Sequence, residues 1–496
     1  MGGSVRSSVL TKVTTITLPR DFTHSRTTLH AIEFFPTSTF HSCSPPKERA
    51  LATKLRSPQA AAVAGTANIP GDLVPTEIGT RAEIAPSTQQ PPLSLYRLLE
   101  PDVLANPYPL YERLRREDPV HWDPYLHAWV VTRYGDVVRV LHDFTSARTP
   151  TPERLAELGL SHLSPIAEAL VKLMLFMDGS QHGRLRGIFS QAFTPTRMER
   201  LRSHIQDIAD RLLDKVLPAG KMDMLDDFAA PLPSIVTAEF LGVPVTDHRK
   251  LKIWSEDFAQ LLGNFQHNPE GAARARKTLD EMVVYFQDAI RAQREHPTDG
   301  LVHSVINAEF NGEKFTEAEL IPNLIATMVG GQETTMNLIC NGVLTLLRNP
   351  DVMEDLRQHP EVTPSAVEEL LRYESPSQHT ARLVPEDMEI GARHIVKGQA
   401  VMAVMGAANR DPERFPDPDR LDIRRQDNKH VAFGFGAHFC FGAPLARLEA
   451  QVAFATILRR LKNLKLQPEP IQWRNNLGLR GLTRLHLTFD AVPGKN

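Results

Sequence analysis

The spacing of hydrophobic side chains divides the chain into two parts. From about Leu93 onward, apolar residues recur every three or four positions, which indicates amphipathic helices packed against a core. Before that point, neither this period nor the alternation typical of a strand is sustained. A segment without an apolar face cannot offset the entropy that it loses on ordering. We therefore predict a disordered extension over residues 1–92 and one folded domain over residues 93–496.

The domain is predicted to be mainly α-helical with small β-sheets. Helices outnumber strands, and the strands do not alternate with helices as they would in a parallel α/β sheet. The expected helices cover residues 108–117, 199–217, 235–242, 248–263, 271–294, 316–348, 351–358, 364–374 and 443–461. The expected strands cover residues 120–122, 129–132, 381–389, 399–404 and 481–489.

Charge and cysteine content exclude several classes of protein. The chain carries 56 basic and 59 acidic residues, so no field of one sign points to nucleic acid as a partner. Three cysteines are too few for a disulfide scaffold or a four-cysteine metal site. No apolar run reaches the roughly 18 residues of a membrane-spanning helix. We therefore expect a soluble, cytoplasmic protein without a membrane anchor.

The first 44 residues leave a second localisation open. They are rich in Ser and Thr and contain four Lys or Arg but only two acids, which is also the composition of an organelle transit peptide. We favour the simpler interpretation, an extension that never packs or an upstream start codon. No apolar segment of the signal-peptide type follows Met1, so secretion is disfavoured.

The most specific chemical signal is the stretch Phe433–Gly442, which contains Cys440 and leads directly into the predicted helix 443–461. Its glycines allow positive φ and let the backbone approach a flat group closely. Free N–H groups and the positive end of the following helix stabilise a thiolate at Cys440. An anionic sulfur in such a loop suits the axial position of a haem iron, where it favours O–O cleavage.

The same stretch matches the haem loop F-G-x-G-x-H-x-C-x-G at every defined position, and here the chain resembles the cytochrome P-450 family. The stretches Ala408–Pro412 and Leu445–Glu449 resemble its soluble bacterial branch. The resemblance implies haem b as the cofactor, with Cys440 as the axial iron ligand. It also implies one large domain with a long central helix over the haem. A zinc site at His438 and Cys440 is disfavoured because no second pair of ligands lies nearby.

The long helix 316–348 carries a second signal. It opens with a capping box, Thr316 to Glu319, and contains Gly330 and Gly331 in its middle, where each glycine costs roughly 1 kcal/mol relative to Ala. From the residues alone, a packing kink and a proton relay are equally good interpretations of the segment that follows. The resemblance favours the relay, because the segment is similar to the family's oxygen-activation stretch. It implies that Gly331 shapes the dioxygen groove, and that Glu333 and Thr334 deliver protons.

Glu369 and Arg372 lie one helical turn apart. Alone, such a pair is most simply a surface ion pair worth ~0.2–0.5 kcal/mol. The resemblance implies instead that Arg420, from a proline-rich segment before the cysteine loop, completes a structural ion cluster with these two residues. This cluster would hold the cysteine loop in place.

Four cations are candidates for binding the two haem propionates. His182 and Arg186 lie one turn apart in a basic helix that begins near Asp178. Arg382 and His438 match two further positions of the family. Each of these residues alone could equally be a solvated charge, and only the resemblance joins them in one site.

The resemblance implies a monooxygenase that inserts one atom of dioxygen into a moderately large apolar metabolite of secondary metabolism, by hydroxylation or epoxidation. Electrons would come from NAD(P)H through a ferredoxin-type partner, and we expect a monomer. The alternatives are a peroxide-using or isomerising haem-thiolate enzyme and a non-enzymatic haem sensor. The Glu333–Thr334 pair favours the monooxygenase because the alternatives do not need it.

Overall fold

The computed structural model describes residues 91–157, 161–263, 269–310 and 312–491. Residues 1–90 of the predicted extension lie outside this part of the chain, so their disorder stays a prediction.

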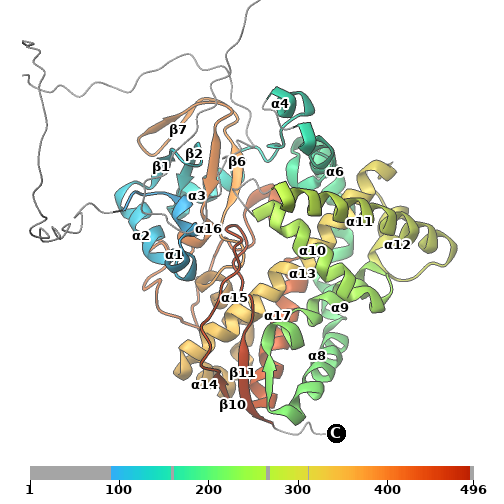
Figure 1. Cartoon of the computed structure of the whole chain (residues 1–496), viewed down its shortest axis with the longest axis vertical. Helices are drawn as coiled ribbons and strands as arrows, with labels where there is room; N and C mark the ends of the chain where they lie inside the picture. The colour runs from blue at the N-terminus through green and yellow to red at the C-terminus, as the bar shows by residue number, and fades with distance from the viewer. Residues whose placement is uncertain (1–90, 158–160, 264–268, 311, 492–496) are drawn as a thin grey trace, which may run out of the picture. The chain divides into compact units, whose positions relative to one another are not determined.

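The described residues form a mainly helical domain with small sheets, as the sequence predicts (Figure 1). The helices are α1 (Pro101–Ala105), α2 (Tyr108–Glu117), α3 (Tyr134–Asp143), α4 (Pro152–Glu157), α5 (Ser164–Leu170), α6 (Gly179–Ser190), α7 (Pro195–Glu199), α8 (Arg202–Val216), α9 (Pro231–Leu241), α10 (His248–Gly263), α11 (Pro269–Glu295), α12 (Leu301–Asn307), α13 (Glu317–Arg348), α14 (Pro350–Gln358), α15 (Thr363–Tyr373), α16 (Met405–Ala408) and α17 (Ala443–Arg460). Among the described residues, no helix is long and apolar enough to cross a membrane.

The strands are β1 (Val120–Asp123), β2 (Ala128–Val131), β3 (Lys221–Asp223), β4 (Glu309–Phe310), β5 (Glu313–Lys314), β6 (Thr380–Leu383), β7 (Met388–Ile390), β8 (Arg393–Ile395), β9 (Ala400–Ala403), β10 (Leu461–Leu466) and β11 (His486–Ala491). The largest sheet has the order β1-β2-β9-β6, with β2 and β9 parallel and the other pairs antiparallel. In Figure 1 this sheet lies at the upper left, and helices α8–α12 lie at the right.

Strand β9 shows why the sheet is buried on both faces. All four of its residues are buried. Val401 and Ala403 pack into a cluster with α3, whereas Ala400 and Met402 pack into a cluster with α2. This division follows from the two-residue period of a strand.

Helix α13 is the longest helix among the described residues, with 32 residues, and it packs against α9, α10, α11 and α17. Its predicted capping box is present, since the backbone N–H of Thr316 donates to the Glu319 carboxylate at 3.0 Å. Pro322 lies inside the helix without ending it. Because α13 packs against several other helices, it runs through the interior of the domain, and residues in its middle can border an internal site.

Most predicted elements are confirmed within a few residues, and the differences lie in the strands. The expected strand 381–389 is two strands, β6 and β7, with a turn between them. The expected strand 481–489 begins only at His486, because residues 473–482 form an irregular turn. The sequence pattern does not predict several helices, which are α1, α3, α4, α5, α7, α12 and α16.

Candidate active site

The cysteine loop is shaped by its glycines. Gly434 and Gly436 have φ values of 74° and 71°, a left-handed conformation that side chains disfavour. A Cβ on Gly436 would also lie 3.2 Å from the Cα of His142 on α3. The loop is closed by the Cys440 N–H, which donates to the Phe433 carbonyl at 2.9 Å. The glycine spacing therefore fixes the path that presents Cys440.

Cys440 borders accessible space, in contrast to Cys340, which is fully buried in the core. The protein that surrounds the remaining sides of Cys440 raises the pKa of its thiol by burial. Hydrogen bonds from the N–H groups of Gly442 and Ala443, and the charge of Arg186, act in the opposite direction. These are the groups that would stabilise a metal-bound thiolate.

On α13, Thr334 and Gly330 lie one above the other. The Thr334 hydroxyl donates to the Gly330 carbonyl at 3.0 Å. Gly330 is exposed, and no atom lies within 4 Å of the position that a Cβ would take there. Thr335 is buried on another side of the helix. Gly330 and Thr334 therefore border an open space in the middle of the longest described helix.

The role predicted for Gly331 at the dioxygen groove stays a prediction, and the structure shows a packing contact for this residue. A Cβ on Gly331 would lie 3.0 Å from the Thr237 hydroxyl on α9. Residue 331 is small because α9 packs against it, whereas the neighbouring Gly330 faces the open space. The two glycines point about 100° apart around the helix axis, so Gly331 faces α9 and Gly330 faces the open space.

Glu333 is buried and is paired with an arginine that the sequence did not reveal. Its carboxylate lies 2.5 Å from Arg474, in the turn 473–482, and Arg474 also contacts Glu256 on α10 at 3.0 Å. Burial raises the pKa of Glu333, and Arg474 opposes this shift. No sequence signal marks Arg474, because 141 positions separate it from Glu333.

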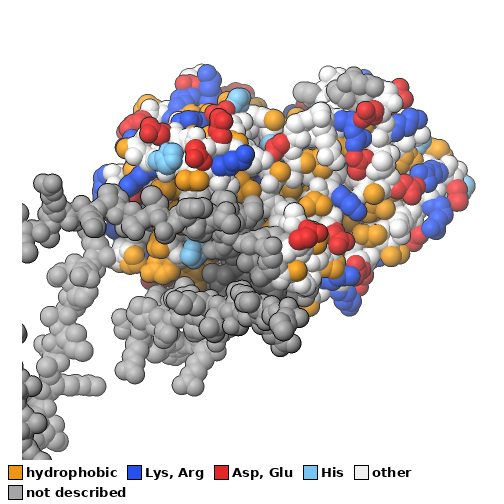
Figure 2. Space-filling model, turned by 90° about the horizontal axis from the view of Figure 1, so that it is seen from above, with side chains coloured by type: hydrophobic (Ala, Val, Ile, Leu, Met, Phe, Trp, Pro, Cys, Tyr) orange, Lys and Arg blue, Asp and Glu red, His pale blue; other side chains and the backbone are white. Residues whose placement is uncertain are grey.

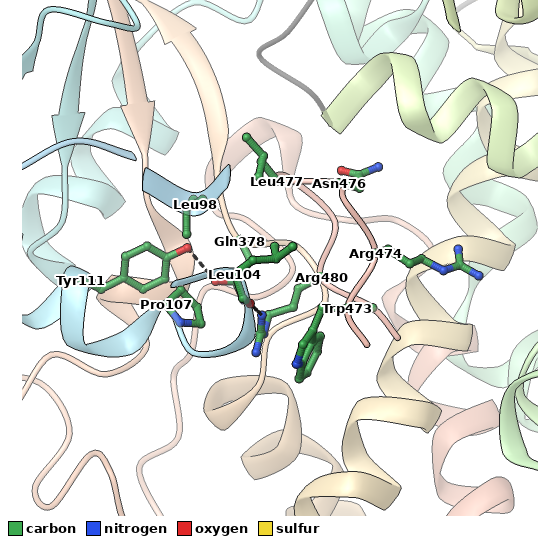
Figure 3. A pocket seen from close by; sticks show the side chains of 11 residues that line it. Leu98, Leu104, Pro107, Tyr111, Gln378, Trp473, Arg474, Asn476, Leu477 and Arg480 are labelled. Atoms are coloured by element: carbon green, nitrogen blue, oxygen red, sulfur yellow. Dashed lines mark hydrogen bonds between the residues drawn. The ribbon is translucent and has the colours of Figure 1, made fainter. Parts of the chain in front are cut away.

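The turn that carries Arg474 lies against the N-terminal helices, as Figure 3 shows. A cavity of about 10 Å³ separates them, close to the minimum for one water molecule. Tyr111 donates to the Gln378 side chain at 3.0 Å beside it. This cavity is too small for an organic substrate.

Three of the four predicted cations lie near one carboxylate, Asp178, and the fourth, Arg186, lies beside the cysteine loop. We call His182, Arg186, Arg382 and His438 the cationic cluster. His438 Nε2 lies 3.0 Å from Asp178, and its ring stacks on that of His182 at 4.2 Å between centroids. Arg186 donates to the Phe439 carbonyl, next to Cys440. The structure thus brings all four together, from α6, β6 and the cysteine loop.

The chain is similar in sequence to known proteins over most of its length. A family model described as Cytochrome P450 matches residues 164–484. The biotin biosynthesis cytochrome P450 of Bacillus subtilis (strain 168) is 37% identical over 78% of this chain and 98% of its own length. The cytochrome P450 monooxygenase PikC of Streptomyces venezuelae is 37% identical over 81% of this chain and 96% of its own length.

The chain belongs to the cytochrome P450 family. It is therefore a haem-dependent monooxygenase. A solved structure of P450BioI, in complex with an acyl carrier protein ligated to hexadec-9Z-enoic acid, superposes with a TM-score of 0.73 at 38% identity, and the match covers 78% of this chain and 99% of that one.

The residues of this P450 fit a haem with two propionates. Arg382 Nε and His182 Nε2 are buried and have no hydrogen-bond partner. Burial lowers the pKa of Arg382 to about 10 and, together with His438 and Arg186, that of His182 to about 4. Arg382 Nε is thus a buried charged donor without an acceptor, which calls for an anionic ligand. His182 is neutral near neutral pH, and its Nε2 donates only in the tautomer that carries the proton there. The exposed rings of Phe435 and Phe439 beside Cys440 provide the apolar surface that a porphyrin needs.

The ion cluster behind the cysteine loop contains Arg425 in place of Arg420. Arg372 and Glu369 are fully buried and pair at 2.8 Å, and Arg425 Nε donates to Glu369 at 3.1 Å. The prediction that the Arg420 side chain joins them is wrong. Its guanidinium is 69% exposed and pairs with Asp422, and only its backbone carbonyl accepts from Arg372. The chain reverses direction here, so the side chain five residues later reaches the carboxylate.

Proposed function

We propose that this cytochrome P450 inserts one oxygen atom of dioxygen into a C–H or C=C bond of a moderately large apolar metabolite, in secondary metabolism. Electrons come from NAD(P)H through a separate ferredoxin-type protein, and the enzyme works as a cytoplasmic monomer. One observation carries this proposal. A threonine hydroxyl is bonded to the carbonyl of an exposed glycine where α13 borders open space, and a buried acid precedes the threonine in the chain.

Cys440 would hold the haem iron, and the cationic cluster would hold the propionates. When bound, haem supplies the iron at which dioxygen is activated. Thr334 Oγ1 accepts and passes on a proton while the Gly330 carbonyl fixes its orientation. Glu333 can supply that proton only after its carboxylate leaves Arg474 and takes up a proton itself, because one carboxylate oxygen is held by the guanidinium. Arg474 therefore acts as a positioning residue for Glu333.

The substrate class is supported by the relatives rather than by a described pocket. Relatives carry names for biotin and polyketide biosynthesis, and another solved relative is described in complex with myristic acid. We infer an acyl or polyketide-like chain. Acidic and basic side chains alternate on the face seen in Figure 2, which gives no basic field for nucleic acid.

The test begins with the reduced carbon monoxide spectrum of the purified haem protein. The wild type is expected to show the long-wavelength band of a thiolate ligand, and Cys440→Ser is expected to lose it while the chain stays folded. A Cys440→Ser variant that keeps this band would refute the ligand assignment.

The reaction class is tested with NADH, a ferredoxin system, myristic acid and labelled dioxygen. One labelled oxygen atom in the product supports the monooxygenase. A protein that turns over only with added hydrogen peroxide, and never with NADH and dioxygen, would support the peroxide-using alternative.

A further inference from the structure

A further, half-buried cation lies beside the cationic cluster and has no role in the site described so far. It is Arg148, in the turn that follows α3. Its Nη1 donates to the Ser146 carbonyl at 3.2 Å, and its guanidinium lies 4.4 Å from the centre of the Phe176 ring. Within the described part of the chain, no acid pairs with it.

Two backbone hydrogen bonds hold this turn against the strand that carries Arg382. The Thr145 N–H donates to the Leu383 carbonyl at 3.1 Å, and the Leu383 N–H donates back to the Thr145 carbonyl at 3.0 Å. Arg148 and Arg382 therefore approach one another from two segments that are fixed by a backbone bridge. Their proximity does not depend on a flexible loop.

Asp178 offsets part of the positive charge of both arginines but forms an ion pair with neither. One of its oxygens faces His438, and the other accepts from the Thr145 hydroxyl and from the N–H groups of Ser146 and Ala147. These bonds lower the pKa of Asp178 even though burial acts to raise it. Both carboxylate oxygens of Asp178 are therefore already hydrogen-bonded to groups other than the two arginines.

The positive charges of the two arginines are poorly compensated. Arg148 keeps part of its surface accessible, but burial and the charge of Arg382 together lower its pKa to about 9, although Asp178 acts in the opposite direction. Arg382 is 3% exposed, and its Nε has no partner. Two like charges in a weakly polar environment cost energy unless an anion lies between them.

We propose that Arg148 joins Arg382 in binding a carboxylate, supplied either by a haem propionate or by a carboxylate-bearing substrate. A carboxylate matches the forked donors of two guanidinium groups. The proposal rests on the haem-dependent function proposed above. Arg148 lies outside the family motifs that the sequence matches.

The experiment compares haem loss from the holoprotein of wild type, Arg148→Gln and Arg148→Lys to an excess of a haem-scavenging apoprotein. If a propionate is the ligand, Arg148→Gln should lose haem about 10-fold faster or more, and Arg148→Lys should lie between. The reduction potential should fall, because removing a cation disfavours the electron-rich state. Arg291→Gln, on the exposed outer side of α11, is the matched control and should leave both quantities unchanged.

The second arm distinguishes the substrate as the source of the carboxylate. Myristic acid and its methyl ester are compared by the spin shift that each induces. Unchanged haem loss, combined with an Arg148→Gln variant that no longer prefers the acid to the ester, assigns the carboxylate to the substrate. Unchanged haem loss and unchanged preference would overturn the proposal.

Two further controls keep these results interpretable. If Arg148→Gln does not accumulate as holoprotein, Arg148→Lys serves in its place, because it keeps the charge but loses the fork of donors. The wild-type carbon monoxide spectrum is read separately, so failure of the haem-thiolate function cannot be mistaken for failure of this proposal.

Discussion

Two groups of buried arginines in this protein differ in how completely their donors are used. Arg372 is fully buried, and its five N–H groups have acceptors: both oxygens of Glu369 and three backbone carbonyls. Arg382 is nearly as buried, yet its Nε has no acceptor, and no carboxylate pairs with it among the described residues. The first group is closed within the protein, and the second is open to a ligand.

This difference distinguishes an arginine that stabilises the fold, Arg372, from one that is available to bind a ligand, Arg382. A closed network has no donor left for a cofactor, so its hydrogen bonds stabilise only the segment before the cysteine loop. An open group is costly in the free protein and regains that cost when an anion binds. Burial and residue type alone would have placed Arg372 and Arg382 in the same class.

The largest effect is expected where the closed network is broken. Arg372→Ala leaves the Glu369 carboxylate buried with weakened pairing, which typically costs ~3–5 kcal/mol of unfolding free energy. We expect little holoprotein and a strongly lowered denaturation midpoint. Arg420→Ala, which removes only an exposed ion pair, should change stability by less than about 0.5 kcal/mol. Equal stability of Arg372→Ala and wild type would show that the network is not structural.

The next effect concerns the open space beside α13. Thr334→Ala should keep the spectrum and substrate affinity but release hydrogen peroxide, lowering product per NADH by about 10²-fold, since proton delivery is misplaced. Thr335→Ser is the matched control because Thr335 is buried away from that space. Unchanged coupling in Thr334→Ala would argue against the relay and for the peroxide-using or isomerising alternative.

A smaller and opposite effect is expected in the cationic cluster. Arg382→Gln removes a poorly compensated charge, so the apoprotein should be as stable as wild type or slightly more so. The holoprotein should lose haem about 10-fold faster, because one donor to a carboxylate is gone. Thermal denaturation of both forms provides the measurement. Destabilisation of the apoprotein to the extent seen for Arg372→Ala would remove the distinction between the two groups.

The smallest effect is expected at Glu449, a buried acid that, like Arg382, lacks an ion-pair partner in the described part of the chain. Glu449 on α17 is 1% exposed, and among the residues that the structure describes neither carboxylate oxygen has a hydrogen-bond partner and no cation pairs with it. Burial raises its pKa well above the ordinary range. The folded state then binds the proton more tightly than the unfolded state, so stability falls as pH rises from the unfolded pKa through the raised one.

Glu449→Gln removes this titration. We expect its melting temperature to exceed that of wild type by about 2 °C or more near neutral pH, with a difference that grows from pH 5 to pH 8. A difference that stays constant across this range would mean that Glu449 is ionised in the folded protein.

The sequence by itself determined the parts of this protein that depend on neighbours along the chain. The glycines around Cys440 set the loop by their φ angles, and the capping box at Thr316 set the start of α13. The Glu369–Arg372 pair lies within one helical turn. In each case the physical cause acts within a few residues, so a pattern in the sequence is sufficient to predict it.

Only the tertiary structure decided which of several similar residues is used. The path of the loop places Arg425, and not Arg420, beside the Glu369 carboxylate. The rotation of α13 against α9 turns Gly330 to the open space and Gly331 to Thr237. Arg474 reaches Glu333 across 141 positions. Such choices depend on where distant segments pack, and local composition does not encode those distances.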